Sequence, residues 1–361
     1  MSSTPFFSII VCTGREDYPF THHPDWHVLG KILEACDGQT FRDFELVIVD
    51  LLHEYRSDYI EKVKGGFGFP ILHIPDKKSI FRELKLPRIC SAKNTGIIFS
   101  RGRYLVFSDD GQEWSRDSFE NLHKWAEQGV GATCRWHLDK GAGPVNIDSR
   151  WVAHGMGGTS ASKVVKAEAI GYFGGTLSMV LADTMLRCNG WDEMFDGTRQ
   201  LEDGDMAQRL GIGGYRVALS GDPLVVEYAM SKWSTDRRII TENPFLKCNG
   251  SYWYPQLFGG RRRLFVNVRL LTNEEIRSFT YNRCRMVKDG RCAVSKDACL
   301  DKWRWYCNPP PGGDWNDETN RNEHFSYMKK VYQDSRLVFD IKRMRNSVIK
   351  EKTDWRKILP L

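Results

Sequence analysis

The sequence contains no run of roughly 18 apolar residues, the length that a membrane-spanning helix needs. Its first residues also lack the basic start and apolar stretch of a secretion signal. Closely spaced cysteine pairs, which structural zinc sites typically use, are missing as well. From the missing membrane segment and the missing secretion signal we expect a cytoplasmic protein, with peripheral contact with a membrane as an alternative. The missing cysteine pairs are an argument against a zinc site.

The sequence contains ten cysteines, and nine of them are interpreted here as free thiols. Without a secretion signal, disulfides are not expected. Five cysteines lie in or beside apolar stretches, where a thiol behaves as a small core residue: Cys12, Cys36, Cys90, Cys134 and Cys188. Four others, near aromatic residues, are interpreted as buried thiols, with a zinc site as the alternative: Cys284, Cys292, Cys299 and Cys307.

Charge is unevenly distributed along the 361 residues, whose formal net charge is +6. Residues 261–361 contain 23 Lys and Arg against 13 Asp and Glu, a net charge of +10, so the remainder carries −4. We interpret the basic tail as a solvated surface. Contact with anionic lipid, nucleic acid or an acidic acceptor is the alternative.

Strands and helices are expected to alternate in the first part of the chain. Short apolar runs rich in β-forming residues predict strands at 6–12, 44–50, 70–74 and 104–107, and helical spacing predicts helices at about 28–37, around 59–63, at 91–99 and after 118. This alternation predicts an α/β fold with a mostly parallel sheet. Residues 141–163 are glycine-rich and weakly patterned, which predicts a flexible loop over a site.

Two adjacent carboxylates follow the central predicted strand. The sequence Gly-Arg-Tyr-Leu-Val-Phe-Ser-Asp-Asp-Gly places Asp109 and Asp110 where the strand ends, and Asp50 ends another strand. Ligands of open α/β sheets bind at this edge. Two carboxylates there suit a divalent cation shared with substrate phosphates, and a solvated Asp-Gly turn is the alternative.

A second acidic group lies far along the chain. Glu202 and Asp203 occupy the predicted first turn of a short helix. There the helix dipole is expected to lower the pKa of a carboxylate and keep it ionised, as a general base requires. Simple capping of the helix by acids is the alternative.

Five blocks in order carry a resemblance to a known family. They are the opening strand with Thr13; Gln39-Thr40-Phe41-Arg42-Asp43-Phe44-Glu45-Leu46-Val47-Ile48-Val49-Asp50; Ala92-Lys93-Asn94-Thr95-Gly96; Gly102 to Asp110; and Asn189-Gly190-Trp191-Asp192-Glu193 with Glu202-Asp203. From Phe7 to about Glu227 the chain resembles the family 2 glycosyltransferases of GT-A fold. The resemblance implies a Rossmann-like sheet, mostly parallel and flanked by helices.

The resemblance also implies a nucleotide-sugar donor, UDP- or GDP-linked, and a Mn²⁺ or Mg²⁺ cofactor at its diphosphate. The implied donor-binding residues are Thr13, Arg15, Asp50, Arg88, Lys93, Asp109, Gly174 and Gly175. Asp109 and Asp110 are implied as metal ligands, with Glu227 as a substitute for the family's late histidine. Asp203, or alternatively Glu202, is implied as the base that deprotonates an acceptor hydroxyl.

We predict a GT-A domain over residues 1–240 and a C-terminal extension over residues 241–361. The extension is rich in basic and aromatic residues, has a helical end and is a candidate for acceptor binding. The predicted function is that of an inverting hexosyltransferase acting on a saccharide or glycoconjugate acceptor, as in polysaccharide biosynthesis, with no nucleic-acid partner.

Two other functions stay open at this point. A sugar-phosphate nucleotidyltransferase has a related sheet, but it favours a basic, glycine-rich loop after the first strand, whereas residues 13–17 are short and acidic. The second is a non-catalytic protein that binds saccharide or nucleic acid through the basic tail.

Overall fold

The computed structural model describes eight segments of the chain. They are residues 4–14, 27–76, 88–139, 148–156, 161–188, 190–191, 202–212 and 214–228. Arg15 and the predicted C-terminal extension, which includes Cys284, Cys292, Cys299 and Cys307, lie outside them.

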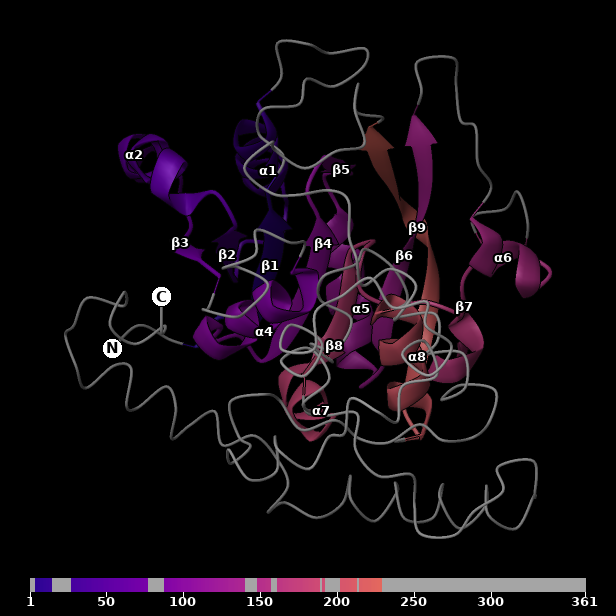
Figure 1. The fold of residues 1–361 in the computed structure, drawn as a ribbon. Coiled ribbons are helices and arrows are strands. Elements are labelled where there is room, and N and C mark those ends of the chain that lie inside the picture. The colour runs from indigo at the N-terminus through magenta and orange to yellow at the C-terminus, as the bar shows by residue number, and fades with distance from the viewer. Residues whose placement is uncertain are drawn as a thin grey trace, which may run out of the picture.

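A nine-stranded sheet forms the centre of the described part (Figure 1). Its strands follow the order β3-β2-β1-β4-β8-β6-β9-β5, and β7 pairs with β9. Their bounds are β1 Phe7–Thr13, β2 Phe44–Asp50, β3 Ile71–Pro75, β4 Tyr104–Asp109, β5 Gln112–Trp114, β6 Gly131–Asp139, β7 Lys163–Lys166, β8 Ser178–Leu181 and β9 Arg216–Tyr228.

The predicted α/β fold class is confirmed, and the sheet has two unlike halves. Strands β3, β2, β1 and β4 are all parallel. Beyond β4 the sheet is mixed, because β8 runs antiparallel to both β4 and β6, whereas β6 and β9 are parallel. The parallel half is the one whose alternating pattern is visible in the sequence.

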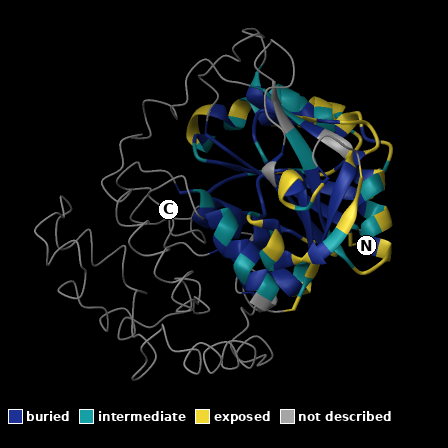
Figure 2. Ribbon diagram, turned by 90° about the vertical axis from the view of Figure 1, so that its right-hand side faces the viewer, coloured by how far each residue is buried: buried dark blue, intermediate teal, exposed yellow. Residues whose placement is uncertain are grey.

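Helices flank the sheet. The α-helices are α1 Val28–Asp37, α2 His53–Val63, α4 Ile89–Phe99, α5 Ser118–Glu127, α6 Ser149–Ala153, α7 Ala182–Arg187 and α8 Glu202–Ile212, with 3₁₀ turns η1 Lys64–Gly66 and η2 Ala167–Ile170. In Figure 2 the interior strands are buried, while exposed positions lie mainly on helices and loops.

The first strand shows how the parallel half is buried on both faces. Ile9 and Val11 belong to the core that includes the apolar stripes of α1 and α5. Ile10 points the other way, toward α4, where Gly96 lets the helix approach so closely that an added Cβ would overlap Ile10. A continuous apolar run is what a doubly covered parallel strand requires.

The prediction of a flexible loop over residues 141–163 is wrong for the residues described there. Residues 149–153 form α6, and its Trp151 side chain is completely buried. Asp148 caps the helix by accepting a hydrogen bond from the backbone N–H of Arg150. A five-residue helix is too short to show helical periodicity, so composition alone suggested a loop.

Other expectations concern thiols and membranes. Cys12, Cys36, Cys90, Cys134 and Cys188 are buried, and none of them forms a disulfide within the described part of the chain, as predicted. Among the helices that the structure describes, none combines the length and the hydrophobicity needed to cross a bilayer.

Candidate functional site

The carboxyl ends of the parallel strands bring the predicted acids to one edge of the sheet. Thr13 is in register with Asp50 across β1 and β2, and Cys12 is in register with Asp109 across β1 and β4. The sequence therefore predicted this edge correctly. It is also the edge at which open α/β sheets bind ligands.

Asp109 and Asp203 face each other across Gly175. A Cβ added to Gly175 would lie 2.7 Å from Oδ2 of Asp109 and 3.5 Å from Oδ2 of Asp203. The backbone N–H of Asp109 donates to the Gly175 carbonyl oxygen at 3.0 Å, which fixes the turn against β4. The two acidic clusters, 94 positions apart in the sequence, thus form one site.

Gly174 completes this turn. Its φ of +124° is a conformation that only glycine adopts readily. An added Cβ would overlap the Trp191 ring and lie 3.1 Å from Oδ1 of Asp203. Gly174 and Gly175 were predicted to border the donor sugar. The structure places Gly175 between the two acids and Gly174 beside Asp203 and Trp191.

Lys93 contacts the acidic cluster from α4. Its Nζ lies 3.1 Å from Oδ1 of Asp203 and 4.0 Å from the centre of the Trp191 ring. Burial disfavours the charged ammonium, but Asp203, Asp109 and Glu202 outweigh that effect and hold the pKa of Lys93 above its ordinary value. The lysine therefore keeps its charge inside the protein.

The pKa of Glu202 is raised, whereas the helix dipole was expected to lower it. Burial, followed by the neighbouring Asp203 carboxylate, raises its pKa to about 7, and Lys93 offsets only part of the rise. Its Oε2 is buried and has no hydrogen-bond partner among the described residues. The prediction that the dipole lowers the pKa is wrong for this residue, because desolvation is the larger effect.

The side chains of Thr13 and Asp110 are hydrogen-bonded to each other. The Thr13 hydroxyl donates to Oδ2 of Asp110 at 2.9 Å, and both residues are buried. The Asp110 side chain is thus buried at the edge of the sheet, whereas the Asp109 side chain is partly exposed there.

Asp50 and Arg88, both predicted to bind the donor, also have partners inside the protein. Asp50 is completely buried and forms an ion pair with Arg56, and His73 Nε2 lies 2.9 Å from its Oδ2. Burial alone would raise the pKa of Asp50, but the contacts from His73 and Arg56 together lower it. Arg88 forms a buried ion pair with Asp76.

Asp76 was missed by the sequence reasoning, although the signal was present. It follows β3 directly, as Asp50 ends β2 and Asp109 ends β4. An acid therefore lies at the end of three of the four parallel strands, β2, β3 and β4, and this pattern would have identified Asp76.

The predicted metal ligands do not form a complete metal-coordination site within the described residues. Within the residues described, no three His, Cys, Asp or Glu side chains lie close enough to hold an ion. Glu227 lies on β9 in register with Gln112 of β5. The partly exposed Asp109 nevertheless fits a Mg²⁺ or Mn²⁺ ion that takes its other ligands from substrate phosphates and water, as such ions commonly do.

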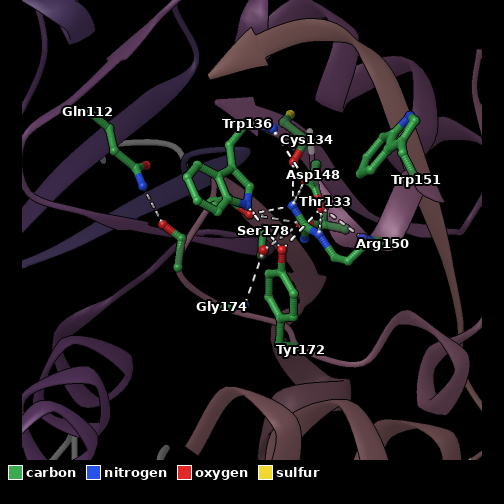
Figure 3. Close-up of polar contacts among 12 residues, drawn as sticks. Gln112, Thr133, Cys134, Trp136, Asp148, Arg150, Trp151, Tyr172, Gly174 and Ser178 are labelled. Atoms are coloured by element: carbon green, nitrogen blue, oxygen red, sulfur yellow. Dashed lines mark hydrogen bonds and ion pairs between the residues drawn. The ribbon is translucent and has the colours of Figure 1, made fainter. Parts of the chain in front are cut away.

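A buried arginine that the sequence reasoning overlooked supports the glycine turn (Figure 3). Arg150 donates from Nε and Nη2 to the two carboxylate oxygens of Asp148 at 3.0 and 2.7 Å. It also donates to the hydroxyls of Thr133 at 2.6 Å and Thr176 at 2.9 Å. Nothing in the sequence pattern distinguished this arginine from a solvated one.

The same network reaches the site through Ser178. Its hydroxyl lies 2.9 Å from that of Thr133 and accepts a hydrogen bond from the Gly174 N–H at 3.2 Å. Gln112 Nε2 donates to the Gly175 carbonyl oxygen at 2.8 Å (Figure 3). The backbone of the turn formed by Gly174 and Gly175 is therefore held by Ser178 on one side and by Gln112 on the other.

A hollow of about 610 Å³ lies elsewhere, between α1 and β5. None of the predicted site residues lines it. We place the candidate site at the converging carboxylates, because they lie at the carboxyl ends of the parallel strands, where open α/β sheets bind ligands.

Comparisons with known proteins gave structural neighbours only. The chain matches no protein-family model and no curated protein. The crystal structure of S. aureus TarS 1–349 aligns with 97% of this chain and 93% of that chain, at 11% identity and a TM-score of 0.48, and the same fragment in complex with UDP-GlcNAc gives the same values. A longer S. aureus TarS structure aligns with 90% of this chain and 55% of that chain, at 11% identity and a TM-score of 0.44. We therefore base the function on the residues of the site.

Proposed function

We propose that this chain is a glycosyltransferase that moves a sugar from a nucleotide-sugar donor to an acceptor hydroxyl with inversion of configuration. The observation that carries the proposal is the pairing of Asp109 and Asp203 across Gly175 at the carboxyl ends of parallel strands. The five sequence blocks that resemble the family 2 glycosyltransferases support it.

Asp109 belongs to the donor side of this reaction. It ends β4 at the edge of the sheet where ligands bind, and it is partly exposed. A divalent ion bound there with the donor would neutralise the charge that develops on the departing diphosphate.

Asp203 belongs to the acceptor side. With 28% of its side chain exposed, it can reach a bound hydroxyl group while Lys93 holds one of its oxygens. As the acceptor oxygen bonds to the anomeric carbon, Asp203 takes its proton. The bond from that carbon to the diphosphate breaks, and the electron pair leaves with the nucleoside diphosphate.

The glycine pair gives the sugar room between the two acids. Side chains at Gly174 or Gly175 would occupy the space beside Trp191, Asp109 and Asp203. Because backbone contacts hold the turn, the distance between the donor and acceptor sides is set before substrate binds.

Finer features of the function belong to the same proposal. The sugar is a hexose, the donor is UDP- or GDP-linked, the ion is Mn²⁺ or Mg²⁺, and the acceptor is a saccharide or glycoconjugate in polysaccharide biosynthesis. Residues 241–361 would contact the acceptor, and the protein would act in the cytoplasm or at a membrane surface.

The test is release of nucleoside diphosphate by the full chain. The protein is incubated with UDP-N-acetylglucosamine, UDP-glucose, UDP-galactose or GDP-mannose, each with mixed saccharide acceptors and Mg²⁺ or Mn²⁺. We expect one donor to be consumed, and Asp203→Asn to slow that turnover roughly 10²- to 10⁴-fold.

The matched control is Asp58→Asn, which removes an exposed carboxylate on α2. It should leave turnover unchanged. Equal activity of Asp203→Asn and the wild type would contradict the assignment of Asp203 as the base.

A further inference from the structure

We infer that Lys93 positions the proposed base: its ammonium group holds the Asp203 carboxylate in place and does not bind the donor diphosphate. This inference rests on the proposed function. It changes the role of Lys93, which the resemblance placed among the donor-binding residues.

The first observation is the enclosure of the ammonium group. Only 3% of the Lys93 side chain is exposed. One of its three N–H donors is directed at Oδ1 of Asp203 at 3.1 Å, and the centre of the Trp191 ring lies 4.0 Å from the nitrogen. A group enclosed in this way has little surface left for a phosphate.

The second observation is the charge around it. Asp203 and Glu202 face Lys93 from α8, Asp109 faces it from β4, and Cys12 faces it from β1. An uncompensated buried ammonium would be strongly unfavourable, and the three acids supply the compensation. Lys93 is thus the internal counter-ion of the acidic cluster.

Moving this lysine to a diphosphate would be costly. The ammonium group of Lys93 is buried, and leaving Asp203 would take away the nearest charge that compensates it, while Glu202 would lose the cation that lowers its pKa. We therefore expect Lys93 to stay with Asp203 while substrate enters and leaves.

The Trp191 ring, which packs against the Lys93 ammonium group, is held in place as well. Arg209, completely buried on α8, donates from Nη1 to the carbonyl oxygens of Cys188 and Gly190 at 2.6 Å each. The Trp191 ring that follows Gly190 is held against Lys93, and a cation over an indole face is favourable. Two independent contacts consequently restrict the ammonium group to one position.

The experiment compares Lys93→Met with Lys93→Arg, and uses Lys124→Met as a control that removes an exposed lysine of α5. For each protein, kcat is measured with the donor that the wild type consumes, and the affinity for the matching nucleoside diphosphate is measured by calorimetry. Separating kcat from affinity distinguishes a base-positioning residue from a phosphate ligand.

We expect Lys93→Met to lower kcat at least ~100-fold and to leave the nucleoside diphosphate affinity within about threefold of the wild type. The kcat of Lys93→Arg should be at least about tenfold higher than that of Lys93→Met, because arginine keeps the positive charge. A fall in affinity of more than about threefold, or a kcat within about threefold of the wild type, overturns the inference.

A second readout needs no turnover. Carboxyl ¹³C resonances are followed against pH, and the Glu202 signal is identified by its absence in Glu202→Gln. In Lys93→Met the Glu202 carboxyl should titrate at least about one pH unit higher than in the wild type, while Lys93→Arg should match the wild type. An unchanged titration in Lys93→Met overturns the inference.

This readout separates the two possible failures. If no donor is consumed and no nucleoside diphosphate binds, the proposed function fails, yet the Glu202 titration still decides whether Lys93 is the counter-ion of the cluster. If Lys93→Met does not fold, Lys93→Gln, which keeps a hydrogen-bond donor without the charge, is measured in the same way.

Discussion

The side-chain amide of Asn94 pairs with both backbone polar groups of Trp191. Its Nδ2 donates to the Trp191 carbonyl oxygen at 2.9 Å, and the Trp191 N–H donates to Oδ1 at 2.7 Å. Gly190 lies so close that an added Cβ would press on the amide oxygen. This contact joins α4 to the segment before α8 and so fixes Lys93, the neighbour of Asn94, relative to Asp203.

We predict that Asn94→Ala destabilises the protein by roughly 2–4 kcal/mol, because two buried backbone groups of Trp191 lose their partner. Asn121→Ala is the matched control, since that amide hydrogen-bonds at the surface of α5. It should cost under about 1 kcal/mol. Urea unfolding of both variants gives the comparison, and equal losses would contradict the role of Asn94.

The parallel half of the sheet and its acids could be predicted from the sequence for a physical reason. Strands buried on both faces appear as continuous apolar runs, and the acids that end them must meet at one edge. This is why Asp50 and Asp109 were placed correctly. The same logic would have identified Asp76, which follows β3.

Other parts of the site could not be predicted from the sequence. Arg150 is buried by contacts with Asp148, Thr133 and Thr176, and a charged residue in a glycine-rich stretch is usually a solvated one. The pairing of Lys93 with Asp203, 110 positions away, is equally invisible without tertiary structure.

Gly174 allows a prediction about crowding, which is made by comparison with a second glycine of positive φ. Gly171 also has positive φ, but nothing lies within 4 Å of a Cβ added there. Gly171→Ala should therefore cost only about 1–2 kcal/mol, for the backbone conformation alone. Gly174→Ala should cost about 1–3 kcal/mol more, because it must displace the Trp191 ring and because a φ of +124° is less accessible to alanine than the +80° of Gly171.

The measurement is the midpoint of urea unfolding for both glycine variants. A Gly174→Ala protein as stable as Gly171→Ala would contradict the close contact between Gly174 and Trp191.

Glu202 makes stability depend on pH in a defined direction. Its pKa rises from 4.5 to about 7 on folding, so the folded state favours the protonated form. Its contribution to stability is complete below pH 4.5 and is lost as pH rises through 7. Glu202→Gln stays neutral, so relative to the wild type it should gain on the order of 1–3 kcal/mol between pH 5 and pH 8.

Urea unfolding of the wild type and Glu202→Gln at the two pH values tests this. Glu127→Gln, which replaces an exposed carboxylate at the end of α5, should show no comparable gain. If the difference between the wild type and Glu202→Gln is the same at both pH values, Glu202 does not titrate as described.

The most direct test of the central proposal is thermal unfolding of the full chain with UDP, GDP, ADP or CDP, with and without Mn²⁺. A ligand at about 100 times its Kd adds roughly 2.7 kcal/mol to the stability of the folded state. We predict that one nucleoside diphosphate raises the unfolding temperature in the presence of Mn²⁺, that Asp109→Ala abolishes this shift, and that Asp58→Ala retains it. If none of the nucleotides stabilises the wild type, the assignment of the donor site is contradicted.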